Sequence, residues 1–261
     1  MGELKSLVNA IQVLELFKKK SSWGVREISR EVNLGTTVVH RILSTFETMG
    51  YLVVNEVTKQ YEVGFKMYEF SWMFKESISF VDIVRPYMKD LSNKVGETTF
   101  LTWRDDLYGT SIAVEESKVQ SIRFIFDIGS KRLLHAGASN LVILAFVPEE
   151  DLARLLDEQL VKFTDYTPMT KEEILQRLTI IREQGWYCTF GEATKDVTGI
   201  AVPIFDCRNE VMGSFTIAGP TYRLHEGTIQ ENVASLLEMK EVVQRYIIDF
   251  KITRQNINQY T

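Results

Sequence analysis

The feature that most constrains this chain is a pair of short helical patterns separated by a three-residue break. Apolar residues recur three and four positions apart at Val25, Ile28 and Val32, which places them on one face of a helix. Residues 33–35 (Asn-Leu-Gly) interrupt the pattern, and either the glycine of this break or Thr36 can cap a second helix. The chain therefore predicts two helices joined by a tight turn.

The second helix pattern has an apolar stripe and a polar side that is unusual for a solvated surface. The stripe is formed by Val39, Ile42, Phe46 and Met49. The polar side has an acid only at its edge, Glu47, and otherwise carries Thr37, His40, Arg41, Ser44 and Thr48. These side chains suit a DNA major groove, where hydroxyls and arginine contact phosphates and base edges and an acid would be repelled. An ordinary helical hairpin in a small core is the alternative.

The segments on either side favour the DNA-binding interpretation. Two strand-like runs follow at residues 51–54 and 60–63, and residues 55–59 form a turn between them. Helix, turn, helix and hairpin is the order of a winged helix-turn-helix, with Lys59 near the tip of the wing. Upstream, an apolar stripe predicts a first helix that braces the other two; its members are Leu4, Leu7, Ile11, Leu14 and Phe17.

Several further segments share their order and spacing with one known family. In the first part they are SLVNAIQVLELF (6–17), VREISREVNL (25–34), TTVVHRIL (36–43), MGYL (49–52) and YEVGFKMYEF (61–70). Beyond it they are GET (96–98), LLHAGASN (133–140), ILAF (143–146), IREQGW (181–186), IAVPIFD (200–206) and IAGP (217–220). Over nearly its whole length the chain resembles the IclR-type bacterial transcriptional regulators. The resemblance implies an α+β fold: an N-terminal winged helix-turn-helix domain, a linker helix and a GAF-like mixed α/β effector-binding domain.

Length and composition agree with this organisation. A chain of 261 residues with 45% hydrophobic content accommodates a small domain and a larger one, each with a core. We expect a DNA-binding domain at 1–64, a linker helix and dimer contact at 65–79, and an effector-binding regulatory domain at 80–261. Two cysteines are too few for a disulfide framework, and no signal peptide or long apolar run is present, so we expect a cytoplasmic protein.

The net charge of −5 is distributed unevenly along the chain. Residues 1–75 contain ten Lys and Arg against eight Asp and Glu, a net charge of +2, which leaves −7 for the rest. A charge of +2 is weak for a DNA binder, so affinity would depend on individual groups and on two or more copies binding together. The residues predicted to contact DNA are Lys5, Arg26, Thr36, Thr37, Val38, His40, Arg41, Ser44 and Lys59.

Residues 65–78 form a helical pattern that is apolar on nearly every side. Such a helix must be buried on several faces, and a domain of this size cannot cover it alone. We expect it to pack against its copy in a dimer, which is also the role that the resemblance implies. The alternative is that it folds onto the second domain of its own chain.

The second domain alternates predicted helices and strands. Helices are expected at 82–95, with Pro86 in the first turn, and at 139–147, 148–157, 170–184 and 226–250. Thr170 and Glu173 form a capping box for the fourth of these. Strands are expected at 98–104, 108–117, 121–127, 199–205 and 211–218, with a hairpin turn at residues 105–106. This order fits an antiparallel sheet with helices packed on it.

A loop at residues 135–138 precedes the predicted helix at 139 and offers a candidate ligand site. Free N–H groups and the helix dipole there favour an anion, so we expect a carboxylate on the backbone N–H groups of Ala138 to Asn140. The resemblance implies that this loop binds the effector, commonly a small organic or aromatic acid. The predicted effector-binding residues are Gly137, Ala138, Ser139, Asn140, Cys188, Thr189, Gly199, Thr216 and Ala218. They are less polar than their counterparts in some members, which favours a larger or more apolar acid, for example an aromatic one; a pocket filled by its own side chains is the alternative.

No motif indicates catalysis or a bound metal. The chain lacks a phosphate loop, GxSxG, HExxH and CxxC, and His135, His225, Cys188 and Cys207 have no metal-ligand spacing. We therefore expect no enzyme activity and no cofactor. The sequence predicts a dimeric or tetrameric regulator that binds a DNA operator, represses rather than activates, and responds to an acid effector. The alternative is a ligand-binding or catalytic protein whose winged helix mediates protein contacts.

Overall fold

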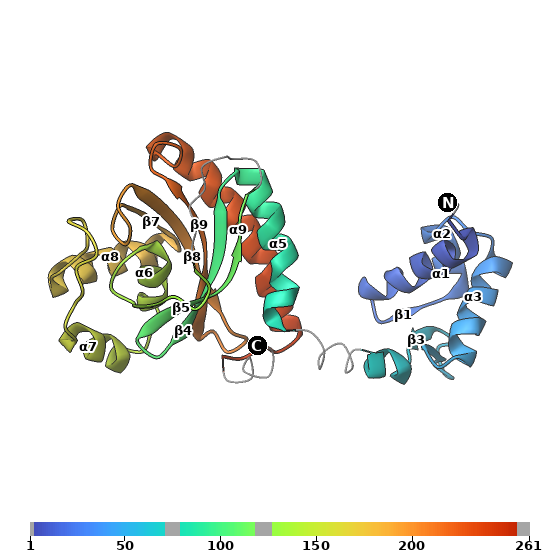
Figure 1. The fold of residues 1–261 in the computed structure, drawn as a ribbon. Helices are drawn as coiled ribbons and strands as arrows, with labels where there is room; N and C mark the ends of the chain where they lie inside the picture. Colours follow the sequence, from blue (N-terminus) through green and yellow to red (C-terminus); the bar gives the residue numbers. More distant parts are fainter. Residues whose placement is uncertain (1–2, 71–78, 118–126, 255–261) are drawn as a thin grey trace. The chain divides into compact units, whose positions relative to one another are not determined.

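The structure, a computed structural model, describes residues 3–70, 79–117 and 127–254 (Figure 1). The chain divides into two compact units, Met1–Ser77 and Ile78–Thr261, and each unit is described by itself. In the described ranges no helix has the length and apolar character needed to cross a membrane.

The first unit is a helix-turn-helix followed by a small sheet. Its helices are α1 (Lys5–Glu15), the 3-10 turn η1 (Leu16–Lys18), α2 (Val25–Glu31) and α3 (Thr36–Thr48). Its strands are β1 (Ser22–Trp23), β2 (Leu52–Val54) and β3 (Tyr61–Val63), paired antiparallel in the order β1-β3-β2. The predicted helices, turn and hairpin are all present. Strand β1 was not predicted, because two residues are too few to make a periodic pattern.

The core of the first unit corrects two predicted apolar faces. Its buried members are Val13, Leu16, Trp23, Ile28, Val39, Leu43, Leu52 and Tyr61. The first half of the predicted apolar stripe of α1 is not buried: Leu4, Leu7 and Ile11 are 68%, 56% and 50% exposed. The reason is that only the C-terminal end of α1 and the turn η1 contribute to the core. Met49, at the C-cap of α3, is likewise 52% exposed. The first unit thus keeps an exposed apolar surface.

The second unit is built on one antiparallel sheet. Its strands are β4 (Thr98–Asp105), β5 (Tyr108–Glu115), β6 (Lys131–Leu133), β7 (Tyr187–Phe190), β8 (Val197–Phe205) and β9 (Val211–Pro220), in the order β6-β5-β4-β9-β8-β7. Its helices are α5 (Phe80–Val95), α6 (Ala138–Leu144), α7 (Glu149–Asp157), α8 (Lys171–Gln184) and α9 (Glu226–Asp249). The predicted α+β class is confirmed.

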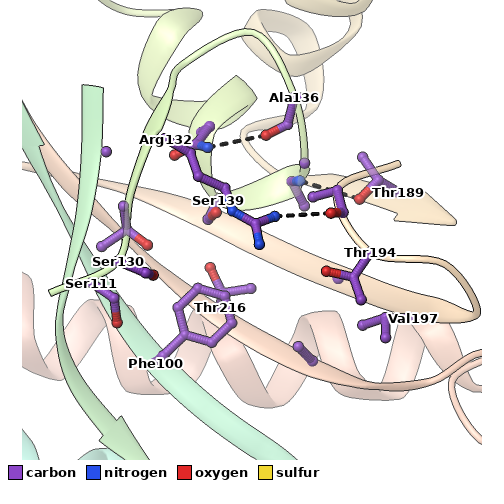
Figure 2. Close-up of a pocket in the computed structure, with 18 residues that line it drawn as sticks. Phe100, Ser111, Ser130, Arg132, Ala136, Ser139, Thr189, Thr194, Val197 and Thr216 are labelled. Carbon is purple, nitrogen blue, oxygen red and sulfur yellow. Dashed lines mark hydrogen bonds between the residues drawn. The ribbon is translucent and has the colours of Figure 1, made fainter. Parts of the chain in front are cut away.

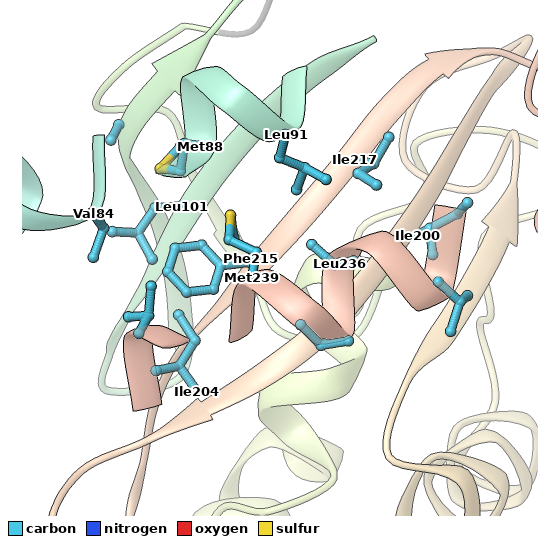
Figure 3. Packing of buried hydrophobic residues seen from close by; sticks show 14 of the residues in the cluster. Val84, Met88, Leu91, Leu101, Ile200, Ile204, Phe215, Ile217, Leu236 and Met239 are labelled. Carbon is cyan, nitrogen blue, oxygen red and sulfur yellow. The ribbon is translucent and has the colours of Figure 1, made fainter. Parts of the chain in front are cut away.

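Helices cover both faces of this sheet. Helices α5 and α9 lie on one face, and α6 to α8 lie on the other (Figure 1). Figure 3 shows the core on the α5–α9 side, where Phe215 and Ile217 of β9 pack with Met88 and Leu236. Thr216, between them in the strand, faces the α6 side, because successive strand residues point to opposite faces. This alternation decides which residues reach the candidate site.

Local details of the second unit both confirm and correct the predictions. The capping box of α8 is confirmed, with the Thr170 hydroxyl accepting the Glu173 N–H at 3.2 Å. Helix α5 begins at Phe80 after a Ser79–Asp82 capping box, so the placement of Pro86 in its first turn is wrong. Pro86 lies in the helix interior, where the proline ring removes one backbone hydrogen bond.

Three differences concern strands and turns. The hairpin turn lies at residues 106–107, one position later than predicted, because β4 and β5 pair as far as Asp105 and Tyr108. Strands β6 and β7 were not predicted. Most of the strand expected at 121–127 lies outside the described residues.

Candidate functional site

The N-terminal part of α3 presents an exposed, acid-free surface. Its first turn contains no acidic residue, and Thr36, Thr37, His40 and Arg41 are exposed. Val38 is 43% exposed, on the flank of α3 that faces α1, and Ser44 is half-buried. The structure thus brings Thr36, Thr37, His40 and Arg41 to one accessible side of the helix, whereas Val38 lies on its flank.

The remaining predicted DNA contacts lie on other elements. Lys5 begins α1 and Arg26 lies in α2, and both are exposed. Lys59 stands in the wing turn with a positive φ of 56°. Its Nζ lies 3.0 Å from the Glu56 carboxylate, an exposed pair that contributes little energy but offsets part of the positive charge at the wing. The structure thus pairs Lys59 with an acid of the same turn.

The second unit contains a pocket of about 50 Å³ on the α6 side of its sheet (Figure 2). Strands β4, β5, β8 and β9 form its base, and residues 130–140 and 189–197 form its walls. Eight of the nine predicted effector residues line it. The lining residues are Phe100, Thr102, Gly109, Ser111, Ser130, Arg132, Ala136, Gly137, Ala138, Ser139, Asn140, Thr189, Ala193, Thr194, Val197, Gly199, Thr216 and Ala218.

The ninth predicted residue, Cys188, lies on the wrong face. It precedes Thr189 in β7, so its side chain points to the opposite side of the sheet and packs against the α5–α9 core. Burial, with a smaller contribution from the charge of Glu192, raises the pKa of the Cys188 thiol to about 12. Cys188 therefore does not line this pocket, contrary to its predicted place beside Thr189.

The expected anion site at the start of α6 is also largely occupied by the protein. Gly137 is the N-cap, with a positive φ of 83°, and α6 has only seven residues. The Ala138 N–H donates to the Thr189 hydroxyl at 3.2 Å, and the Asn140 N–H donates to the Gly137 carbonyl at 3.1 Å. Two of the three N–H groups predicted to hold a carboxylate are thus already bonded within the protein.

Sequence reasoning missed the charged residue of the pocket, Arg132. It lies in β6, opposite Gly109 of β5, and Figure 2 shows its guanidinium pointing into the pocket. Its Nη1 donates to the Ala193 carbonyl at 2.9 Å, and the guanidinium carbon lies 5.1 Å from the ring centre of Phe163. Burial lowers the pKa of Arg132. No periodic signal marks Arg132, because β6 is only three residues long.

Three hydroxyls of the pocket are buried without a hydrogen-bond partner in the part of the chain that the structure describes. They belong to Ser111, Ser130 and Thr216. Buried polar groups are normally satisfied, so each such group calls for an explanation, of which a bound molecule is one. The pocket therefore combines a cation with unfulfilled hydrogen-bonding groups.

The walls of the pocket are held by buried polar residues behind it. The carboxylate of Glu192 pairs with Arg177, and the backbone carbonyl of Glu192 accepts a hydrogen bond from the Thr167 hydroxyl at 2.8 Å. Burial raises the pKa of Glu192, although the positive charge of Arg177 acts in the opposite direction. His135 is fully buried, with Nε2 2.9 Å from the Val161 carbonyl and its ring stacked on Phe163. Burial lowers the pKa of His135. Among the described residues no group of three or more His, Cys, Asp or Glu could hold a metal ion.

Comparison with known proteins gives a consistent result for both units. The family described as "Bacterial transcriptional regulator IclR C-terminal" matches residues 75–245, and "IclR helix-turn-helix domain" matches residues 6–56. The regulator BhcR of Paracoccus denitrificans is 27% identical over 91% of this chain and 85% of its own length. The transcriptional repressor IclR of Escherichia coli is 24% identical over 94% and 91%. The crystal structure of Thermotoga maritima IclR has a TM-score of 0.62 and 26% identity, covering 94% of this chain and all of that one (100%).

Proposed function

The chain belongs to the IclR family of bacterial transcriptional regulators, which bind DNA and are not enzymes, and we propose that it is a repressor whose operator affinity is set by a small organic acid. The observation that carries the proposal is the combination of two sites in one chain. One is the acid-free surface at the start of α3, and the other is the pocket of the second unit.

The DNA-binding part of the proposal rests on the exposed residues of α3. Arg41 can pair with guanine or clamp a phosphate, and Thr37 and His40 extend the same surface. Lys5, Arg26, Thr36, Val38, Ser44 and Lys59 complete the proposed contacts. Because the first part of the chain has a net charge of only +2, we expect these local contacts rather than an overall field to supply affinity.

Regulators of this family act on their operators as oligomers, and we place the contact of a dimer near residue 65. The described helical residues 65–70 include Phe65, Tyr68 and Phe70, which are 71%, 57% and 53% exposed. Such large apolar side chains favour burial against a second copy. The rest of the expected linker helix, residues 71–78, lies outside the described residues. Tetramers would arise from further contacts between dimers.

Effector control is supported by the pocket of the second unit. Its base is formed by strand residues and its walls by loops, and both are typical of a site for a small molecule. Two relatives carry the word repressor in their names, IclR of Escherichia coli and the acetate operon repressor of Salmonella typhimurium, and this favours repression over activation. A bound acid that favours one state of the protein would change operator affinity by about 1–3 kcal/mol, a usual range for allosteric coupling.

A gel-shift experiment tests the proposal. The full chain is titrated onto genomic fragments at two salt concentrations, with and without a panel of small acids. We expect a subset of fragments to bind, an affinity that falls with salt, and at least one acid that changes the affinity. Binding without sequence preference, or no DNA binding at all, would instead support the alternative in which the winged helix contacts protein.

A further inference from the structure

We propose that Lys240, on the last helix of the second unit, is a covalent modification site whose amine accepts acyl groups from activated donors, the acyl phosphates and thioesters. The site lies on α9 and shares no residue with the pocket on the α6 side of the sheet. The inference goes beyond the proposed function and does not depend on it, because acylation of this amine requires neither DNA nor a bound effector.

The helix around Lys240 supplies no carboxylate. On an α-helix, the side chains three and four positions away are the neighbours of a residue. For Lys240 they are Leu236, Leu237, Val243 and Gln244. Leu236 and Val243 are fully buried, so Lys240 stands at the margin of the core face of α9 and is itself half-buried. Its ammonium group therefore has apolar neighbours and no acid on its own side of the helix.

The end of strand β8 forms the wall beside which Lys240 lies. The Lys240 Nζ is 5.5 Å from the ring centre of Phe205. Gln244 holds this wall against α9, because its Oε1 accepts the Phe205 N–H at 3.3 Å and its Nε2 donates to the Phe205 carbonyl at 2.8 Å. Phe205 also packs edge-on against Phe146, with ring centres 5.1 Å apart. These contacts hold Lys240 beside an aromatic side chain that offers no oxygen acceptor to the ammonium.

Lys240 also differs from a nearby lysine of the same unit. Lys94 of α5 pairs with Glu238, two positions before Lys240 on α9, at 2.9 Å. Within the described residues, no acid lies at ion-pairing distance from Lys240. Burial lowers the pKa of Lys240. A larger share of this amine is therefore neutral than would be neutral for a fully exposed lysine.

Acylation uses the neutral amine, because the lone pair of Nζ is the nucleophile. Nζ attacks the carbonyl carbon of the donor and forms a C–N bond, and the bond from that carbon to the phosphate oxygen or the thioester sulfur breaks. Phosphate or thiolate leaves, and the proton lost by Nζ passes to water or to the leaving group. The product is a neutral amide, which costs less to keep half-buried than an ammonium does. The surroundings of Lys240 thus favour both the reacting form and the product.

Mass spectrometry of the full chain after brief treatment with acetyl phosphate tests the site. Lys94, exposed and paired, and Lys89, exposed on the same helix, are internal controls. We expect the initial rate of acetylation at Lys240 to exceed both control rates severalfold, and a parallel reaction with acetyl-coenzyme A identifies which donor acts. Unfolding the chain in urea should abolish the preference, because it removes the surroundings of Lys240. A rate at Lys240 no higher than the controls with both donors, or a preference that persists in urea, would overturn the proposal.

Gln244→Glu tests the physical reason. It places a carboxylate one turn from Lys240 and keeps an acceptor for the Phe205 N–H. Because glutamate and lysine four positions apart attract each other, acetylation at Lys240 should slow severalfold while both control lysines react as before. Val242→Glu is the matched control, since it adds the same charge to α9 at an exposed position on another side of the helix, and it should leave the rate unchanged.

Thermal unfolding shows whether each variant folds. An unchanged acetylation rate at Lys240 in folded Gln244→Glu would contradict the proposal, as would equal slowing by Val242→Glu. The wild-type comparison with the two control lysines decides the matter if Gln244→Glu does not fold.

Discussion

The hydroxyl of Thr189 accepts a hydrogen bond at 3.2 Å from the backbone N–H of Ala138, although 51 positions separate the two residues. The bond links strand β7 to the start of α6. It uses an N–H group that the sequence predicted to bind a ligand. Thr189 also pairs in register with Gly199, and both line the pocket. The same contact therefore holds one wall of the pocket in place and leaves this N–H without a free position for a ligand.

Cys188, the neighbour of Thr189, should be irrelevant to ligand binding. We expect Cys188→Ala to leave acid affinity within about twofold, because its side chain lies on the far face of the sheet. Burial raises the pKa of this thiol to about 12, so little thiolate forms near neutral pH and alkylation should be slow. Mass spectrometry after iodoacetamide treatment tests the second point. Rapid alkylation of Cys188 in the folded protein, or a large loss of acid affinity in the variant, would contradict this placement.

Arg41 should supply a substantial share of operator affinity. We predict that Arg41→Ala weakens operator binding by about 1–3 kcal/mol, whether it contacts guanine or phosphate. Arg245→Ala is a matched control, because Arg245 is also exposed but lies on α9 of the second unit. Gel-shift titrations at several salt concentrations measure both. If Arg41→Ala binds operator with wild-type affinity and an unchanged dependence on salt, the assignment of α3 to the DNA interface is wrong.

Residues 1–78 should dimerise as an isolated fragment. The unit Met1–Ser77 is compact with its own core, and Phe65 is 71% exposed on it. Phe65→Asp should dissociate the dimer by placing a charge in an apolar contact. Val57→Asp is the control, because Val57 is even more exposed, at 91%, but lies in the wing turn. Sedimentation at tens of micromolar decides the matter, and a monomeric wild-type fragment would rule out the proposed contact.

The sequence predicted best those features that depend on local patterns. Helices α2 and α3 carry periodic apolar residues, and the capping box of Thr170 and Glu173 is a contact between residues three positions apart. The buried face of α1 could not be predicted in the same way. Leu7 and Ile11 satisfy helical periodicity as well as Val13 does, and only the position of the core decides which side is covered.

The pocket was predictable only in part. Thr189, Gly199 and Thr216 came from the family resemblance, and the alternation along β7 could have excluded Cys188 if that strand had been predicted. Arg132 gave no signal because its role depends on the pairing of β6 with β5. Such pairing between distant segments is a property of the sheet, and no spacing along the chain reports it.

His135 should make the stability of the protein depend on pH. Burial lowers the pKa of His135 in the folded protein. Below about pH 6.5, His135 is therefore protonated more readily in the unfolded chain than in the folded one. The free energy of unfolding should therefore fall as pH falls below that value, by at most about 1.4 kcal/mol per pH unit from this group. Denaturant titrations at several pH values should give a flatter dependence for His135→Gln than for wild type. His40→Gln, at an exposed position, is the control, and equal slopes in both variants would argue against His135.

Gly199 offers a way to fill the pocket without disturbing the fold. A methyl group at this position would lie 3.6 Å from the Ala138 Cβ and 3.7 Å from the Thr189 hydroxyl, which is ordinary contact. At Gly109, by contrast, an added Cβ would overlap the Asn140 side chain. Gly199→Ala should therefore fold, with stability raised by about 0.4–1 kcal/mol because the unfolded chain loses freedom.

The added methyl group occupies part of a pocket of only about 50 Å³, so an acid should no longer fit. Since coupling between two sites is reciprocal, a protein that cannot bind the acid should bind operator as wild type does without acid, and should ignore its addition. Thermal unfolding and gel-shift titrations with and without the panel of small acids measure the two effects. A folded Gly199→Ala protein whose operator binding still responds to the acid as wild type does would show that the effector binds elsewhere.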